Sequence, residues 1–77
     1  MNVNIGLNCI IGPKVKFGKN VKIGHNCILT GEILIGDNSE LKNFVELRDK
    51  TIVGENCFID SRVTTSGNCT IGNNVTL

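Results

Sequence analysis

A repeat of six residues runs through this chain of 77 residues, and it limits the chain to a narrow set of folds. Counting in steps of six from residue 5, twelve of thirteen positions hold a large apolar side chain, and Thr65 is the exception. The residue two places before each of these positions is small or β-branched. No insertion interrupts either series between residues 3 and 77. Such self-similarity is typical of solenoids, in which each repeat packs only on its neighbours.

Each six-residue unit is expected to hold a short strand and a corner. Side chains alternate between the two faces of a strand, so two inward positions with one outward position between them form a strand of three residues. The other three residues must turn the chain. Glycine frequently begins this turn, and asparagine, which tolerates a positive φ better than most residues, frequently ends it. The asparagines stand at positions 8, 20, 26, 38, 56, 68 and 74.

A longer period of 18 residues indicates three strands per coil. The segments Gly18-Lys19-Asn20, Gly36-Asp37-Asn38, Gly54-Glu55-Asn56 and Gly72-Asn73-Asn74 recur at this spacing. Three units would close a triangle, and these segments would stack at one of its corners. With about 4.8 Å between neighbouring strands, slightly more than four coils give a prism about 20 Å tall.

The repeat resembles that of the hexapeptide-repeat family, the left-handed parallel β-helix of acyl- and acetyltransferases. The resemblance covers essentially the whole chain. It implies an all-β, single-stranded, left-handed parallel β-helix of about four 18-residue coils, forming one domain over residues 1–77. The left-handed sense comes from the resemblance alone, since general rules favour right-handed crossovers.

The repeat pattern continues to Leu77 without a capping helix. Exposed strand edges are normally covered in natural proteins. We therefore expect a fragment of a longer transferase, a truncated chain or an array capped by another chain. A short natural protein stabilised by oligomerisation is the alternative.

Composition excludes several classes of partner. Eight basic and seven acidic residues give a net charge of +1, without a basic run, so we expect no nucleic-acid partner. No apolar stretch approaches the roughly 20 residues of a membrane helix, and the N-terminus lacks the features of a signal peptide. We therefore expect no membrane association.

The four cysteines all occupy small inward positions, and they are Cys9, Cys27, Cys57 and Cys69. They lack the close sequence pairing typical of a metal site, and the chain has a single histidine. We expect reduced thiols in the core, no bound metal and a cytoplasmic location. A disulfide between Cys9 and Cys27 is conceivable, because the 18-residue period stacks them.

Outward apolar residues indicate a self-association surface. Ile10 and Ile28 would lie in adjacent coils on one face, and Leu34 and Ile52 on another. Stacked apolar pairs on neighbouring faces are typical of an interface. Members of the resembled family are typically homotrimers, so we predict a homotrimer that uses these four residues. The alternative is that missing parts of a longer chain cover them.

The only histidine is a candidate general base. The segment Ile23-Gly24-His25-Asn26-Cys27 is similar to the aliphatic-x-His-[Asp/Asn]-small segment of hexapeptide acyltransferases that act on sugar nucleotides. The resemblance implies that His25 removes a proton from an acceptor hydroxyl or amine, which then attacks a thioester. Imidazole suits this work because its pKa lies near neutrality. An ordinary solvated corner histidine is the alternative.

A second segment, from Asn43 through Phe44 to Arg48, resembles a stretch in the acetyltransferase domain of bacterial N-acetylglucosamine-1-phosphate uridyltransferase. Asn43 and Arg48 match its asparagine and basic residue, while Ser61 stands where that enzyme has its catalytic histidine. By this resemblance we assign Asn43, Arg48 and Arg62 to substrate or cofactor binding, with the arginines contacting phosphate. Solvated corner cations are the alternative for the two arginines.

These features leave two functional hypotheses. The first is transfer of an acetyl or longer acyl group from acetyl-CoA, or another acyl thioester, to a sugar or sugar nucleotide. The second is a non-catalytic β-helical trimerisation or scaffold module, or a fragment of a sugar nucleotidyltransferase or acetyltransferase. The absence of insertion loops and the single histidine favour the second, and the context of His25 favours the first.

Overall fold

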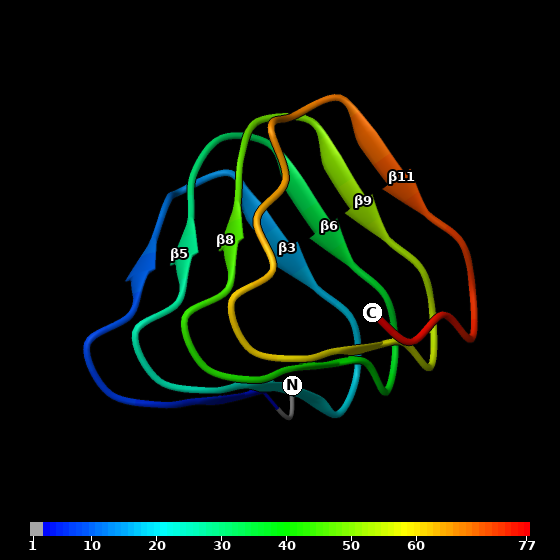
Figure 1. Ribbon diagram of the computed structural model, residues 1–77, viewed down its shortest axis with the longest axis horizontal. Coiled ribbons are helices and arrows are strands. Elements are labelled where there is room, and N and C mark those ends of the chain that lie inside the picture. Colours follow the sequence, from blue (N-terminus) through cyan, green and yellow to red (C-terminus); the bar gives the residue numbers. More distant parts are fainter. Residues whose placement is uncertain (1–2) are drawn as a thin grey trace.

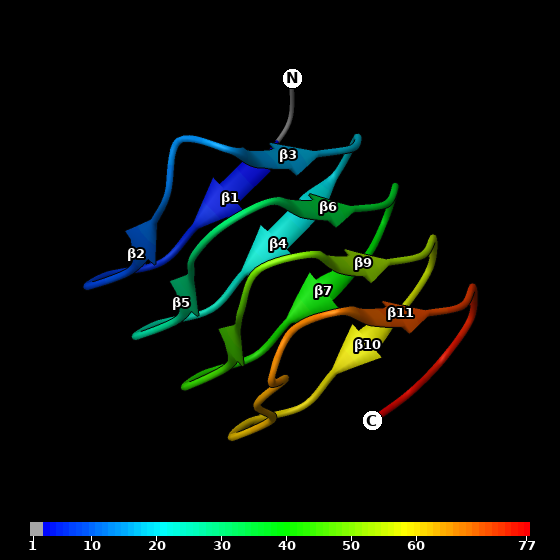
Figure 2. The ribbon, with the colours of Figure 1, turned by 90° about the horizontal axis from the view of Figure 1, so that it is seen from above.

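The computed structural model describes residues 3–77, so the first two residues of the expected 1–77 domain lie outside the described part. Within this part the structure is all-β and contains no helix (Figures 1 and 2). The strands are β1 (Val3–Ile5), β2 (Ile10–Ile11), β3 (Val15–Phe17), β4 (Val21–Ile23), β5 (Ile28–Leu29), β6 (Ile33–Ile35), β7 (Glu40–Leu41), β8 (Glu46–Leu47), β9 (Thr51–Val53), β10 (Phe58–Ile59) and β11 (Cys69–Ile71).

The strands form three parallel sheets that make the three sides of a triangular solenoid. The sheet orders are β1-β4-β7-β10, β2-β5-β8 and β3-β6-β9-β11. Paired strands lie 18 residues apart in the sequence, so that Val3 pairs with Val21 and Ile10 with Ile28. Figure 2 shows the successive coils stacked in register. The predicted solenoid of about four 18-residue coils is confirmed.

The two inward series form the core. Their members in the second and third coils are almost fully buried. Ile23 is 4% exposed, and the others are at most 2% exposed: Val21, Cys27, Leu29, Ile33, Ile35, Ser39, Leu41, Val45, Leu47, Thr51 and Val53. Thr65, the exception in the apolar series, is also buried, and its hydroxyl lies 3.0 Å from that of Thr51. Thr65 Oγ1 also accepts the N–H of Arg48, and Thr51 donates to the Arg48 carbonyl. A satisfied hydrogen-bond network therefore replaces one apolar contact.

Three columns of corners join the sheets. The first corner comprises residues 6–8, 24–26, 42–44 and 60–62; the second, 12–14, 30–32, 48–50 and 66–68; and the third, 18–20, 36–38, 54–56 and 72–74. All seven asparagines that end a corner have φ between 49° and 61°, as expected. Phe44, Lys50 and Arg62 adopt the same left-handed conformation, which costs such residues about 1–2 kcal/mol. The geometry of these three corners therefore imposes this conformation although the side chains do not favour it.

The described residues span 27 × 25 × 22 Å, in keeping with the short prism expected from the repeat. They contain no helix that could span a membrane.

Candidate functional site

The structure separates the four predicted site residues into two places. His25, Asn43 and Arg62 lie in consecutive coils of the first corner, whereas Arg48 lies at the second corner. The sheet β2-β5-β8 runs between these corners. The polar candidates therefore gather around the first corner without Arg48.

The imidazole of His25 caps the coil before it. Its Nδ1 accepts the backbone N–H of Leu7 at 2.8 Å. The ring reaches this position because Gly6 has no side chain: a Cβ there would lie 2.6 Å from Nδ1. Since Nδ1 uses its lone pair as an acceptor, the neutral ring carries its proton on Nε2. His25 thus presents a hydrogen-bond donor, rather than a free lone pair, to its surroundings.

Asn43 repeats this arrangement one coil later. Its Oδ1 accepts the backbone N–H of His25 at 2.8 Å, and its side chain lies over Gly24. A Cβ at Gly24 would approach Asn43 Oδ1 and the Lys42 carbonyl to 2.6 Å. The amide oxygen of Asn43 is therefore committed to the coil-to-coil contact, and its amide nitrogen is the group left for other partners.

The same contact recurs at all three corner columns. Asp37 accepts the N–H of Lys19, Asp49 that of Glu32, and Asn73 that of Glu55, each at 2.8 Å. Sequence reasoning missed this ladder. Its signal is the recurrence of Asp, Asn or His at the middle position of a corner that lies 18 residues after a corner containing glycine. Part of the role of His25 and Asn43 is therefore structural.

A shallow hollow of about 300 Å³ adjoins His25 and Asn43, and we refer to it as the first-corner hollow. It is lined by Lys22, Ile23, Gly24, His25, Glu40, Leu41, Lys42 and Asn43. Lys42 Nζ lies 3.6 Å from Glu40 Oε2 and 5.9 Å from the centre of the Phe58 ring. Neither lysine was among the residues predicted to form a site, because outward lysines are ordinary on a solvated strand or corner.

The two arginines have different surroundings. Arg62 lies 5.8 Å from the centre of the exposed Phe44 ring, one coil away at the first corner. Arg48 Nε forms an ion pair with Glu46 Oε2 at 3.2 Å. Phosphate contact by Arg48 would compete with this carboxylate, and by Arg62 with the aromatic ring. Their assignment to phosphate binding remains a prediction.

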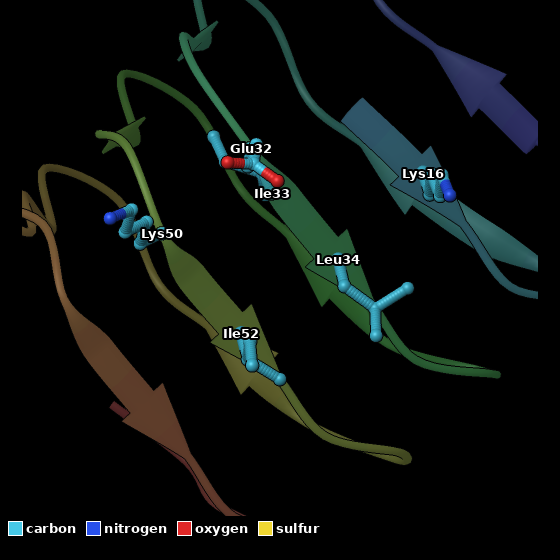
Figure 3. A pocket seen from close by; sticks show the side chains of 6 residues that line it. All are labelled: Lys16, Glu32, Ile33, Leu34, Lys50 and Ile52. Carbon is cyan, nitrogen blue, oxygen red and sulfur yellow. The ribbon is translucent and has the colours of Figure 1, made fainter. Parts of the chain in front are cut away.

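The outward apolar pairs lie at the positions that the repeat predicts. Ile10 pairs with Ile28 in the sheet β2-β5-β8, and Leu34 pairs with Ile52 in the sheet β3-β6-β9-β11. Leu34 and Ile52 are 47% and 44% exposed. Figure 3 shows these two side chains next to each other on adjacent strands, with Lys16 beside them. The two sheets meet at the second corner, so the apolar pairs flank one edge of the prism.

The cysteines face inward, as predicted, and all four thiols are free. The thiols of Cys9, Cys27 and Cys57 point to backbone carbonyls in the next coil, 15 residues further along, at 3.1, 3.0 and 2.9 Å. Burial raises the pKa of the Cys27 thiol above its ordinary value of 9.0. Among residues 3–77, no three His, Cys, Asp or Glu side chains come together as a metal site would require.

Comparison with known proteins identifies one family that this repeat matches. A family model described as the GMPPB C-terminal domain matches residues 1–77. A comparison with curated proteins finds no significant match. The family match supports a left-handed hexapeptide-type β-helix related to sugar nucleotidyltransferases. It does not single out the acetyltransferases that the repeat resembles.

Proposed function

Because this chain belongs to the family of the GMPPB C-terminal domain, we propose that it is a non-catalytic association module of a sugar nucleotidyltransferase-related protein. In this proposal the β-helix packs side by side with two further copies of itself and holds them as a homotrimer. The observation that carries the proposal is the placement of Ile10 with Ile28, and of Leu34 with Ile52, on two sheets that share an edge.

The geometry of a closed ring supports three copies. In a heterologous ring each copy presents one face to the neighbour on one side and a different face to the neighbour on the other. In a trimer of triangular prisms, two adjacent faces of each prism supply these two different contact surfaces. The third sheet, β1-β4-β7-β10, presents Asn4, Lys22, Glu40 and Phe58 outward, so it is the more polar face and would remain in water.

The state of His25 favours a structural role for this residue. A general base needs an available lone pair, and the lone pair of the neutral ring is used by the Leu7 N–H. Proton abstraction at Nδ1 would require this hydrogen bond to break. A scaffold needs no such rearrangement.

Native mass spectrometry of the purified 77-residue chain tests the proposal. We expect a trimer for the wild type and a monomer for the Leu34→Glu and Ile28→Glu variants, because each change buries a carboxylate in the apolar contact. Asn4→Glu is the matched control, since it adds the same charge to the outward face of β1, and it should remain trimeric. A monomeric wild type would refute the proposal, as would glutamate variants that stay trimeric.

Acyl transfer is the second candidate, and the position of His25 and Asn43 beside the first-corner hollow favours it. In this proposal His25 acts as the base, and acetyl-CoA or another acyl thioester donates to a sugar or sugar nucleotide. Asn43, Arg48 and Arg62 would bind substrate or cofactor. Acetyl-CoA added to the same mass-spectrometry sample should then bind the trimer, and His25→Ala should lose acetyl-transfer activity. A trimer that binds no acetyl-CoA would contradict this candidate.

A further inference from the structure

We propose that the first-corner hollow binds a phosphate group, either as inorganic phosphate or as the phosphate of a small organic monoester. The proposal is independent of the association module, because the hollow lies on the sheet and corner that the proposed trimer leaves in water. It is also independent of acyl transfer, because no step requires His25 to act as a base.

The polar groups that line the hollow are mostly hydrogen-bond donors. Lys22 and Lys42 contribute ammonium groups, which donate and cannot accept. His25 contributes Nε2–H, because its Nδ1 already accepts the Leu7 N–H. Asn43 contributes its amide nitrogen, because its Oδ1 already accepts the His25 N–H. The coil-to-coil ladder thus engages Nδ1 of His25 and Oδ1 of Asn43, and it leaves the N–H donors of these two side chains available.

Glu40 is the one carboxylate that lines the hollow, and Lys42 lies beside it at 3.6 Å. Two ammonium groups against one carboxylate leave a net positive charge at neutral pH. A donor-rich, positively charged hollow is complementary to an anion with several strong hydrogen-bond acceptors. A phosphate monoester carries a charge of about −1.5 to −2 and three strong acceptor oxygens, so it satisfies both conditions.

The shape of the hollow is compatible with a small phosphate. Gly24 lines it without a side chain, and its volume of about 300 Å³ accommodates a phosphate with a small organic group. The lysines are accessible to water, so salt screens their attraction for the anion. We therefore expect weak binding, with a Kd on the order of 1 mM, that weakens further as salt is added.

The test is an NMR titration of the full 77-residue chain with sodium phosphate at constant ionic strength. We expect saturable shift changes concentrated at Lys22, His25, Lys42 and Asn43. His25→Asp is the decisive variant, because Asp37 at the same middle position of a corner accepts the corresponding backbone N–H, 18 residues earlier. It should keep the coil contact, remove the donor and add a negative charge, and so weaken phosphate binding by about tenfold or more.

Lys42→Gln should also weaken binding, by about three- to tenfold. Lys19→Gln is its matched control, because Lys19 is a corner lysine that does not line the hollow, and it should leave the Kd unchanged. Titration with glucose 6-phosphate distinguishes the two sources of phosphate. If glucose 6-phosphate binds more tightly than inorganic phosphate, the hollow is assigned to an organic monoester, and if the two bind equally, it is assigned to the phosphate group alone.

Shift changes that do not saturate would overturn the proposal, as would acetate binding as tightly as phosphate or unchanged phosphate binding in His25→Asp.

Discussion

Leu7 donates its backbone N–H to Nδ1 of His25, 18 residues away, at 2.8 Å. This bond joins the first coil to the second at the first corner, and it orients the only imidazole in the chain. Asp37, Asn43 and Asn73 accept a backbone N–H of the preceding coil in the same way, each through a side-chain oxygen.

Replacing His25 by alanine should lower the free energy of unfolding by about 1 kcal/mol, because the Leu7 N–H loses its acceptor. His25→Asn is the matched control, since its Oδ1 can take the place of Nδ1, as Asn43 Oδ1 does one coil later. Urea denaturation measures both. Equal loss of stability in the two variants would show that the hydrogen bond to Leu7 contributes little.

Gly24→Ala should destabilise the chain by about 1–3 kcal/mol, because the added Cβ would lie 2.6 Å from both the Lys42 carbonyl and Asn43 Oδ1. Gly72→Ala occupies the same position in its own corner but would meet no atom within 4 Å. Its effect should be much smaller. Thermal unfolding of the two variants compares them directly, and similar losses would mean that close packing of the coils is not the reason for glycine at position 24.

Lys50→Asn should raise the free energy of unfolding by about 0.5–1 kcal/mol, because Lys50 has a φ of 61°, which asparagine tolerates better. The control is Glu32→Asn, one coil earlier at the second corner. There the positive φ, 94°, falls on Gly31 instead, so asparagine at position 32 relieves no strain. Chemical denaturation should show a gain for Lys50→Asn only, and a gain for both would assign it to another cause.

The buried Cys27 thiol should make stability depend on pH in the alkaline range. Its pKa is raised in the folded chain, chiefly by burial, so the unfolded chain releases the proton first as the pH passes about 9.0. Stability is therefore complete below this pH and falls above it, by at most about 1.4 kcal/mol for each pH unit. Cys27→Ser lacks this thiol, and its hydroxyl can donate to the Lys42 carbonyl as Ser39 donates to Gly54. The alkaline decline of the unfolding free energy should be shallower in Cys27→Ser than in the wild type, and equal slopes would contradict the assignment.

Most of the fold could be predicted from the sequence. The six-residue period identified which side chains face inward, and the 18-residue period identified which residues stack, as the pairing of Leu34 with Ile52 confirms. Asparagine at the corners predicted the left-handed conformation at seven positions. The same conformation at Phe44 and Arg62 was not predictable from residue preference, because the local geometry of these two corners overrides that preference.

The candidate site was predictable only in part. The sequence singled out His25, Asn43, Arg48 and Arg62 as polar corner residues, yet it gave no reason to group Lys22 and Lys42 with the first two. A strand lysine and a corner lysine one coil apart come together only when the coils stack. The ion pair of Arg48 with Glu46 and the contact of Arg62 with Phe44 likewise depend on side-chain conformations that the repeat leaves open.

The architecture follows from the amino-acid pattern alone: a regular period with no insertion sets the strands, the corners, the core and the outward apolar pairs, because side-chain alternation and chain closure are local properties of the backbone. The roles of the polar residues depend on contacts between coils. Whether His25 presents a lone pair or a proton depends on the Leu7 N–H in the neighbouring coil, and whether Asn43 presents its oxygen or its nitrogen depends on His25. Those partners are 18 residues apart, and the stacking of complete coils brings them within hydrogen-bond distance.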